Sequence, residues 1–141
     1  MASKASEPKK EVRVPVSSDN DLVTARREGR FMAEQLGLSS SEATLVATAI
    51  SELARNIVSY ARNGEIHICL INNGVRRGIT IVARDEGPGI ADTKLAVQAG
   101  YSTSGGLGLG LPGVRRIMDE FEINSEPGRG TTITITKWTR R

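Results

Sequence analysis

The sequence contains a single cysteine and a single histidine among 141 residues. One cysteine excludes an internal disulfide bond and favours a reducing compartment. The chain has no apolar run long enough to span a bilayer, and no charged-then-apolar signal segment at its start. We therefore expect a cytoplasmic protein with no membrane partner.

A strong excess of charge is also missing from the body of the chain. The net charge is +3, but residues 1–10 carry +2 and residues 137–141 carry +3, which leaves −2 for residues 11–136. The basic character therefore lies in two tails that we expect to be solvated. A phosphate-binding surface would need clustered positive charge in the folded part, so we expect no nucleic-acid partner.

Length and hydrophobic patterning predict one α+β domain. We expect a disordered leader over residues 1–10, a folded domain over 11–138 and a basic tail over 139–141. Alternating apolar residues predict strands at 11–16, 65–73, 77–85, 121–125 and 131–138. Helical periodicity and caps predict helices at about 22–36, 39–60 and 111–121, with a short helical piece near 93–99. The fold class predicted is a two-layer sandwich: a mixed, mostly antiparallel sheet of about five strands, with helices on one face.

The first motif that carries chemistry is 51-SELARNIVSYA-61. Glu52 and Asn56 are four residues apart, so a helix places both side chains on one face. A carboxylate can accept a proton, and a neighbouring carboxamide oxygen can bind Mg²⁺. A solvated polar pair fits the same spacing, so this motif alone leaves both interpretations open.

The second motif, 85-DEGPGI-90, follows a strand rich in β-branched residues. Asp85 at the end of that strand can accept a hydrogen bond from an exocyclic amine such as that of adenine. Gly87 and Gly89 allow the backbone to turn tightly. A polar turn is the alternative, because Asp-x-Gly is a common turn pattern.

The third motif, 104-SGGLGLGLPG-113, places glycines and leucines in alternation just before a predicted helix. Free N–H groups and the positive end of a helix dipole suit phosphate oxygens at such a place. The motif is not a P-loop, because no Gly-Lys-Ser/Thr follows, and it does not have the dinucleotide-binding pattern of a parallel βαβ unit.

The order and spacing of these motifs resemble the GHKL ATPase superfamily of gyrase, Hsp90, histidine kinases and MutL. ELARN is similar to the N box, DEGPGI to the first glycine box, GGLGLGL to the second, and the GTT of 128-GRGTTITI-135 to the last, threonine-bearing box. The resemblance covers nearly all of residues 11–138. It implies a Bergerat-type ATP-binding fold with ATP and Mg²⁺ as cofactors.

The resemblance also assigns roles to individual positions. Glu52 would be the general base or would orient the attacking hydroxyl, and Asn56 would bind the Mg²⁺. Asp85 would hold the adenine amine, assisted by Thr131 or Thr132, a choice that stays open. The implied cofactor-binding residues are Asn56, Asp85, Gly87, Gly89, Ile90, Gly106, Leu107, Gly108, Leu109, Gly110, Thr131 and Thr132. Arg55, Lys94 and Arg115 are alternatives for a contact with the γ-phosphate.

Within this superfamily the chain most resembles the small RsbT-type serine/threonine kinases of bacterial partner-switching systems such as the stressosome. We expect no transducer domain, for which the domain is too small, and no phosphoacceptor helix. Such kinases phosphorylate a STAS-domain antagonist or scaffold protein and, when released, activate a PP2C-type phosphatase. The runner-up is an anti-sigma factor kinase, of the SpoIIAB or RsbW type, that sequesters a sigma subunit. A third alternative is a nucleotide-sensing adaptor that binds ATP but transfers no phosphoryl group. The presence of both Glu52 and Asn56 argues against it.

The two rare side chains lie on the same predicted strand. His67, beside Glu65, is expected to face solvent rather than to accept a phosphoryl group. Cys69 is expected on the strand face opposite Ile66 and Ile68, with a packing role rather than a redox one.

Overall fold

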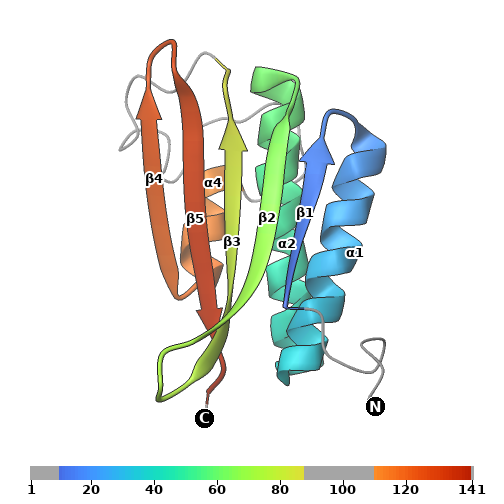
Figure 1. The fold of residues 1–141 in the computed structure, drawn as a ribbon, viewed down its shortest axis with the longest axis vertical. Coiled ribbons are helices and arrows are strands. Elements are labelled where there is room, and N and C mark those ends of the chain that lie inside the picture. The colour runs from blue at the N-terminus through green and yellow to red at the C-terminus, as the bar shows by residue number, and fades with distance from the viewer. Residues whose placement is uncertain (1–9, 88–109, 141) are drawn as a thin grey trace, which may run out of the picture.

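A computed structural model describes residues 10–87 and 110–140 of the chain. The predicted helical piece near 93–99 and most of the predicted leader lie outside the described residues. Figure 1 shows two layers in the described part, with the strands forming one layer and the helices covering a single face of it. The predicted two-layer α+β sandwich is therefore confirmed.

The sheet consists of β1 (Glu11–Val16), β2 (Gly64–Asn72), β3 (Arg77–Asp85), β4 (Glu120–Glu126) and β5 (Gly130–Trp138). Its strand order is β1-β2-β3-β5-β4, and each of these neighbouring pairs is antiparallel. The expected number of strands is confirmed, whereas the term "mixed" is wrong for the described sheet. Short turns join β2 to β3 and β4 to β5, and such turns reverse the chain direction. Pro15 lies in β1 at the edge of the sheet, where a missing N–H costs little.

The helical layer consists of α1 (Asp19–Leu36), α2 (Ser40–Asn56), the π-helix η2 (Ile57–Ala61) and α4 (Gly110–Ile117). Gly37 ends α1 in the left-handed conformation (φ 104°), and the Ser39 hydroxyl caps α2 by accepting the Glu42 N–H at 3.1 Å. The predicted helix over 39–60 is thus an α-helix that turns into a π-helix.

The predicted helix at 111–121 ends earlier than expected, at Ile117. The Asp119 N–H donates to the Thr136 carbonyl of β5 at 3.0 Å, so the chain has already joined the sheet at this point. Phe121 consequently lies in β4. The helix therefore ends because the chain pairs with β5, although the apolar periodicity of the sequence continues.

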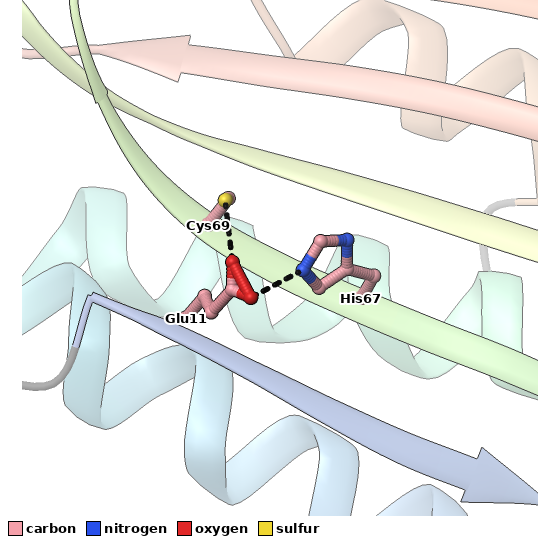
Figure 2. A group of neighbouring side chains, drawn as sticks. All are labelled: Glu11, His67 and Cys69. Carbon is pink, nitrogen blue, oxygen red and sulfur yellow. Dashed lines mark hydrogen bonds and ion pairs between the residues drawn. The ribbon is translucent and has the colours of Figure 1, made fainter.

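Side chains alternate between the two faces of the sheet, as in any strand. On β2, Ile66 and Ile68 are buried under the helices, while His67 and Cys69 lie on the outer face (Figure 2). The expected face of Cys69 is therefore confirmed. The expectation that His67 is solvated is wrong, because only 22% of its side chain is exposed.

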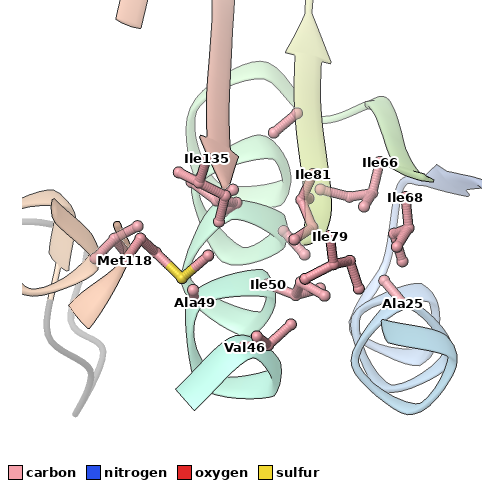
Figure 3. Close-up of a cluster of buried hydrophobic side chains, with 14 of the residues drawn as sticks. Ala25, Val46, Ala49, Ile50, Ile66, Ile68, Ile79, Ile81, Met118 and Ile135 are labelled. Atoms are coloured by element: carbon pink, nitrogen blue, oxygen red, sulfur yellow. The ribbon is translucent and has the colours of Figure 1, made fainter. Parts of the chain in front are cut away.

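The core lies between the inner sheet face and the helices. Figure 3 shows Ile50 of α2 and Ala25 of α1 on the helix side of the core, facing the isoleucines of the sheet. A side chain at Gly29 of α1 would collide with Ile50, so the small residues of α1 let the two helices approach closely. Burial of each large aliphatic side chain stabilises the fold by about 1.5–3 kcal/mol. The largest fully buried side chains are Met32, Ile50, Leu53, Ile57, Ile66, Ile68, Ile79, Ile81, Ile135, Val16, Val46 and Val114.

The basic C-terminal residues are not simply solvated. Lys137 is part of β5 and is only 5% exposed, and its ammonium group donates to the Ile117 carbonyl at 2.9 Å. Arg140 pairs with Glu42 at 3.2 Å and with Asp119 at 3.0 Å. The expectation of a solvated tail is wrong for Lys137, because this residue is on the inner face of a central strand.

Gly130 and Gly128 provide a matched test of close backbone approach. Both have positive φ, 95° and 80°, which disfavours any other residue. A Cβ at Gly130 would collide with the carbonyl oxygen of Asp85, whereas a Cβ at Gly128 would meet nothing within 4 Å. We expect Gly128→Ala to lower the free energy of unfolding by about 1 kcal/mol and Gly130→Ala by about 1–3 kcal/mol more. Urea denaturation measures both, and equal losses would show that β5 does not press against Asp85.

Candidate functional site

Glu52 is a buried carboxylate in the helical layer, with 4% of its surface exposed. Its Oε2 accepts a hydrogen bond from the Arg55 guanidinium at 2.8 Å, and its Oε1 accepts the backbone N–H of Gly110 at 3.3 Å. The first partner is one turn away on α2, and the second is the first residue of α4. The alternative of a solvated polar pair is therefore excluded for Glu52.

Asn56 is the last residue of α2 and is half-buried. Within the described residues its side-chain amide has no hydrogen-bond partner. The π-helix begins at the next residue, with the Arg62 N–H donating to the Ile57 carbonyl at 2.8 Å. Single π-helical turns occur frequently at functional sites. Sequence reasoning missed this turn, because nothing in the apolar spacing of 57–61 departs from an α-helix.

Asp85 is enclosed by backbone. Its Oδ1 accepts the Gly87 N–H at 2.8 Å. A Cβ on Gly87 would lie 2.6 Å from the Cβ of Ala61 in η2, and a Cβ on Gly64 would lie 3.1 Å from the Cβ of Asp85. Together with Gly130, these glycines bring three backbone segments up to the end of β3. Gly64 pairs directly with Asp85 in the strand register, and sequence reasoning did not identify it as a neighbour of Asp85.

The register of β3 and β5 decides between the two threonines. Asp85 pairs with Thr131, so both side chains lie on the helix-facing side of the sheet. Thr132 pairs with Arg84 on the opposite side. Thr131 is 8% exposed, and its hydroxyl lies 2.8 Å from the Ser125 hydroxyl. The structure thus brings Thr131, and not Thr132, to the Asp85 side.

The glycine-rich stretch is described only at its end. Gly110 begins α4 with φ 66° and makes the contact with Glu52. Of the residues implied by the resemblance, Gly89, Ile90, Gly106, Leu107, Gly108 and Leu109 lie outside the described residues, as does Lys94. The described chain therefore ends beside Asp85, at Gly87, and resumes beside Glu52, at Gly110.

Two cationic candidates for phosphate contact differ in their surroundings. Arg55 is engaged with Glu52 and is 35% exposed, while Arg115 lies exposed on α4. Arg55 also lines a groove of about 640 Å³ between α1 and α2. The lining residues are Leu22, Val23, Arg26, Arg27, Arg30, Thr44, Ala47, Thr48, Ser51, Glu52 and Arg55. Glu52 thus borders a basic groove with the 4% of its surface that is exposed, and sequence reasoning did not find this groove because its arginines come from two helices.

This arrangement matches a known family. The chain belongs to the histidine kinase-, DNA gyrase B- and HSP90-like ATPases, whose family model matches residues 41–141. The predicted GHKL membership is thereby confirmed.

Two relatives of the chain are a bacterial protein kinase and a bacterial anti-sigma factor. The chain is 48% identical over 127 residues to the serine/threonine-protein kinase RsbT of Bacillus subtilis, covering 90% of this chain and 96% of that protein. It is 34% identical over 121 residues to an anti-sigma F factor of Caldanaerobacter subterraneus, covering 83% and 85% of the two chains. The predicted resemblance to the RsbT type is confirmed.

A solved structure shares the fold. The structure of the RsbU and RsbW domains of a Mycobacterium tuberculosis protein superposes with a TM-score of 0.66 at 20% identity. The match covers 95% of this chain and 34% of that one. Within residues 10–87 and 110–140, no helix is both long and apolar enough to cross a membrane.

The Glu52–Arg55 pair should contribute measurably to stability. We expect Arg55→Gln to lower the free energy of unfolding by about 1–2 kcal/mol, because it leaves a buried carboxylate with one partner fewer. In a Glu52→Gln background the same change should cost about 1 kcal/mol less. The control is a cycle on the exposed pair Arg30 and Glu34, 3.4 Å apart, where coupling of about 0.3–0.5 kcal/mol is expected. Equal coupling energies in the two cycles would contradict the expectation that the buried pair contributes more to stability than the exposed pair.

Proposed function

We propose that the chain is an ATP- and Mg²⁺-dependent protein serine/threonine kinase of a bacterial partner switch. Its substrate would be a serine or threonine of a STAS-domain protein, and the released kinase would activate a PP2C-type phosphatase. The observation that carries the proposal is the placement of Glu52. Glu52 is a buried carboxylate on α2 that accepts the N–H of Gly110, the first residue of α4. It lies one helical turn from Asn56, whose side-chain amide has no partner among the described residues. The relative named a serine/threonine-protein kinase, which the chain matches over 96% of its length, supports the same reaction.

The residues present fit a bound nucleotide and metal. Asp85 keeps Oδ2 without a partner among the described residues, which leaves one acceptor for an amine such as that of adenine. The glycines at 64, 87 and 130 bring backbone, and no side chain of their own, close to the end of β3. Asn56 has an uncommitted amide oxygen, a suitable ligand for Mg²⁺. We assign Asp85 and Thr131 to the base, and Asn56 to the metal.

In the transfer itself, bound Mg-ATP supplies the γ-phosphoryl group. Glu52 would accept the proton of the attacking serine or threonine hydroxyl on Oε1 or Oε2, since each oxygen has a further lone pair beyond its present bond. The hydrogen bonds from Arg55 and Gly110 hold the carboxylate in one orientation. Positioning of this kind supplies much of the rate in phosphoryl transfer.

The basic groove gives the partner a route to Glu52. Arg26, Arg27 and Arg30 of α1 line it together with Glu52 and Arg55 of α2. A protein segment seated there would reach the carboxylate from the α1 side. We therefore place the phosphoacceptor hydroxyl at this groove.

A second candidate function is that of an anti-sigma factor kinase that sequesters a sigma subunit. The relatives named anti-sigma F factor, 34% identical over 85% of the first one's length, favour it. Both candidates use the same site, and they differ in the partner that is bound most tightly.

Incubation with Mg-ATP and candidate STAS partners tests the proposal. Mass spectrometry should find a phosphoserine or phosphothreonine on the partner. Glu52→Gln should slow the transfer by about 100-fold or more, because it removes the proton acceptor. Asn56→Ala should raise the Mg²⁺ concentration needed for half-maximal activity.

The control is Glu34→Gln, the same chemical change at an exposed position on α1, which should leave the rate unchanged. Labelling that survives both Glu52→Gln and Asn56→Ala would refute the assigned roles. Stable co-purification with a sigma factor, without transfer to any STAS protein, would favour the second candidate.

The two threonines give a sharper test of nucleotide placement. Thr131→Val should weaken ATP binding roughly tenfold, because it removes a hydroxyl on the Asp85 side, and Thr132→Val should change it less than about twofold. Isothermal titration calorimetry measures both. Ser125→Ala removes the hydroxyl contact of Thr131 but not Thr131 itself, and so controls for loss of local structure. A larger effect at Thr132 would place the base on the other face of the sheet.

A further inference from the structure

The outer face of the sheet brings the single histidine and the single cysteine together with a carboxylate. His67 and Cys69 are two residues apart on β2 and therefore point to the same side. Glu11 on the edge strand β1 pairs directly with Cys69 in the register. Figure 2 shows the three side chains converging, with the Glu11 carboxylate between the other two.

The distances in this cluster leave a gap between the polar atoms. His67 Nε2 lies 3.5 Å from Glu11 Oε1, and Cys69 Sγ lies 3.9 Å from Glu11 Oε2. All three ligand atoms lie within 4.8 Å of one another. The nitrogen–oxygen separation exceeds the usual range of a hydrogen bond. The thiol–carboxylate hydrogen bond and the imidazole–carboxylate contact are thus both long.

His67 Nε2 is the most telling of these atoms. Among the described residues it is the one side-chain nitrogen or oxygen that is shielded from solvent and has no hydrogen-bond partner. Buried polar atoms nearly always have a partner, because an unsatisfied one costs about 1–3 kcal/mol. This nitrogen points toward the Glu11 carboxylate, and an atom bound between the two groups would satisfy it.

We propose that Glu11, His67 and Cys69 bind a divalent transition-metal ion, with Zn²⁺ as the best fit. Tetrahedral zinc holds sulfur at about 2.3 Å and nitrogen or oxygen at about 2.0–2.2 Å, so its ligand atoms are roughly 3.3–3.7 Å apart. The measured separations reach this range with side-chain shifts of roughly 1 Å. Thiolate and imidazole ligands favour zinc over magnesium, so this site is chemically distinct from the one at Asn56.

The charges of the cluster also balance. One carboxylate, one thiolate and one neutral imidazole neutralise a divalent cation. The positive Arg13 nearby is already paired with Glu65 at 3.0 Å. Binding would release the thiol proton of Cys69 to solvent and form the sulfur–metal bond.

The expected role is that of a clip between the edge strand and its neighbour. Glu11 is on β1, and the other two ligands are on β2. Three protein ligands leave the fourth position of a tetrahedral ion to water or to a partner's side chain. The cluster lies on the sheet face that carries no helices, away from Glu52, so binding should stabilise the fold without changing nucleotide binding.

Cobalt(II) titration of the untagged full-length chain tests the site. We expect one Co²⁺ per chain, a sulfur-to-cobalt charge-transfer band and the intense visible bands of tetrahedral cobalt. Because the chain has one cysteine and one histidine, the signal can be assigned directly. Added Zn²⁺ should displace the cobalt and raise the midpoint of thermal unfolding.

Variants identify the ligands. Cys69→Ser should abolish the charge-transfer band, and His67→Gln should weaken binding about 100-fold. Glu11→Gln should weaken it by about tenfold or more, whereas the matched control Glu65→Gln, an acidic neighbour on the same face, should change it less than about twofold. Circular dichroism checks that each variant folds. Absence of the charge-transfer band in the unmodified chain, a stoichiometry of one metal per two chains, or equal effects of Glu11→Gln and Glu65→Gln would overturn the proposal.

Discussion

A buried carboxylate must be paired, and this requirement organises the helical layer. Removing a charged group from water costs several kcal/mol unless hydrogen bonds compensate. Glu52 has one local partner, Arg55, and one partner 58 residues away, the N–H of Gly110. The first turn of α4 must therefore lie against α2, and the glycine-rich stretch must end at the acid. The hydrogen bond from Gly110 that satisfies the carboxylate also fixes its position beside the basic groove.

A second constraint acts at the other end of the site. Asp85 is reached by three backbone segments, and each of them presents a glycine where a side chain would collide. Close approach of this kind surrounds the strand end with backbone, and Thr131 lies beside Asp85 on the helix-facing side. The residues assigned to proton transfer and to base recognition thus lie on separate elements, α2 and β3. The sheet and the helical layer must pack correctly for both to serve one nucleotide.

The sequence revealed the features that depend on local patterns. Alternation of apolar and polar residues predicted β1 and β3 with their observed ends. Features that depend on distant contacts were not predictable in this way. The end of α4 depends on Thr136, and the burial of Glu52 depends on Gly110. The choice of Thr131 over Thr132 needed the β3–β5 register, and the cluster of Glu11, His67 and Cys69 needed the β1–β2 register. The resemblance to a known family supplied roles for the motif residues, but no distances between them.

The π-helical turn after Asn56 changes the direction in which the side chains that follow it point. A π-turn holds about one residue more than an α-turn, and one residue of α-helix corresponds to a rotation of about 100°. An unbroken α-helix would therefore turn Ala61 away from Gly87, its contact at the end of β3. The extra residue in η2 acts as a rotational correction. It lets the continuous helical segment Ser40–Ala61 present Asn56 five residues before its end and still place Ala61 against Gly87 at its end.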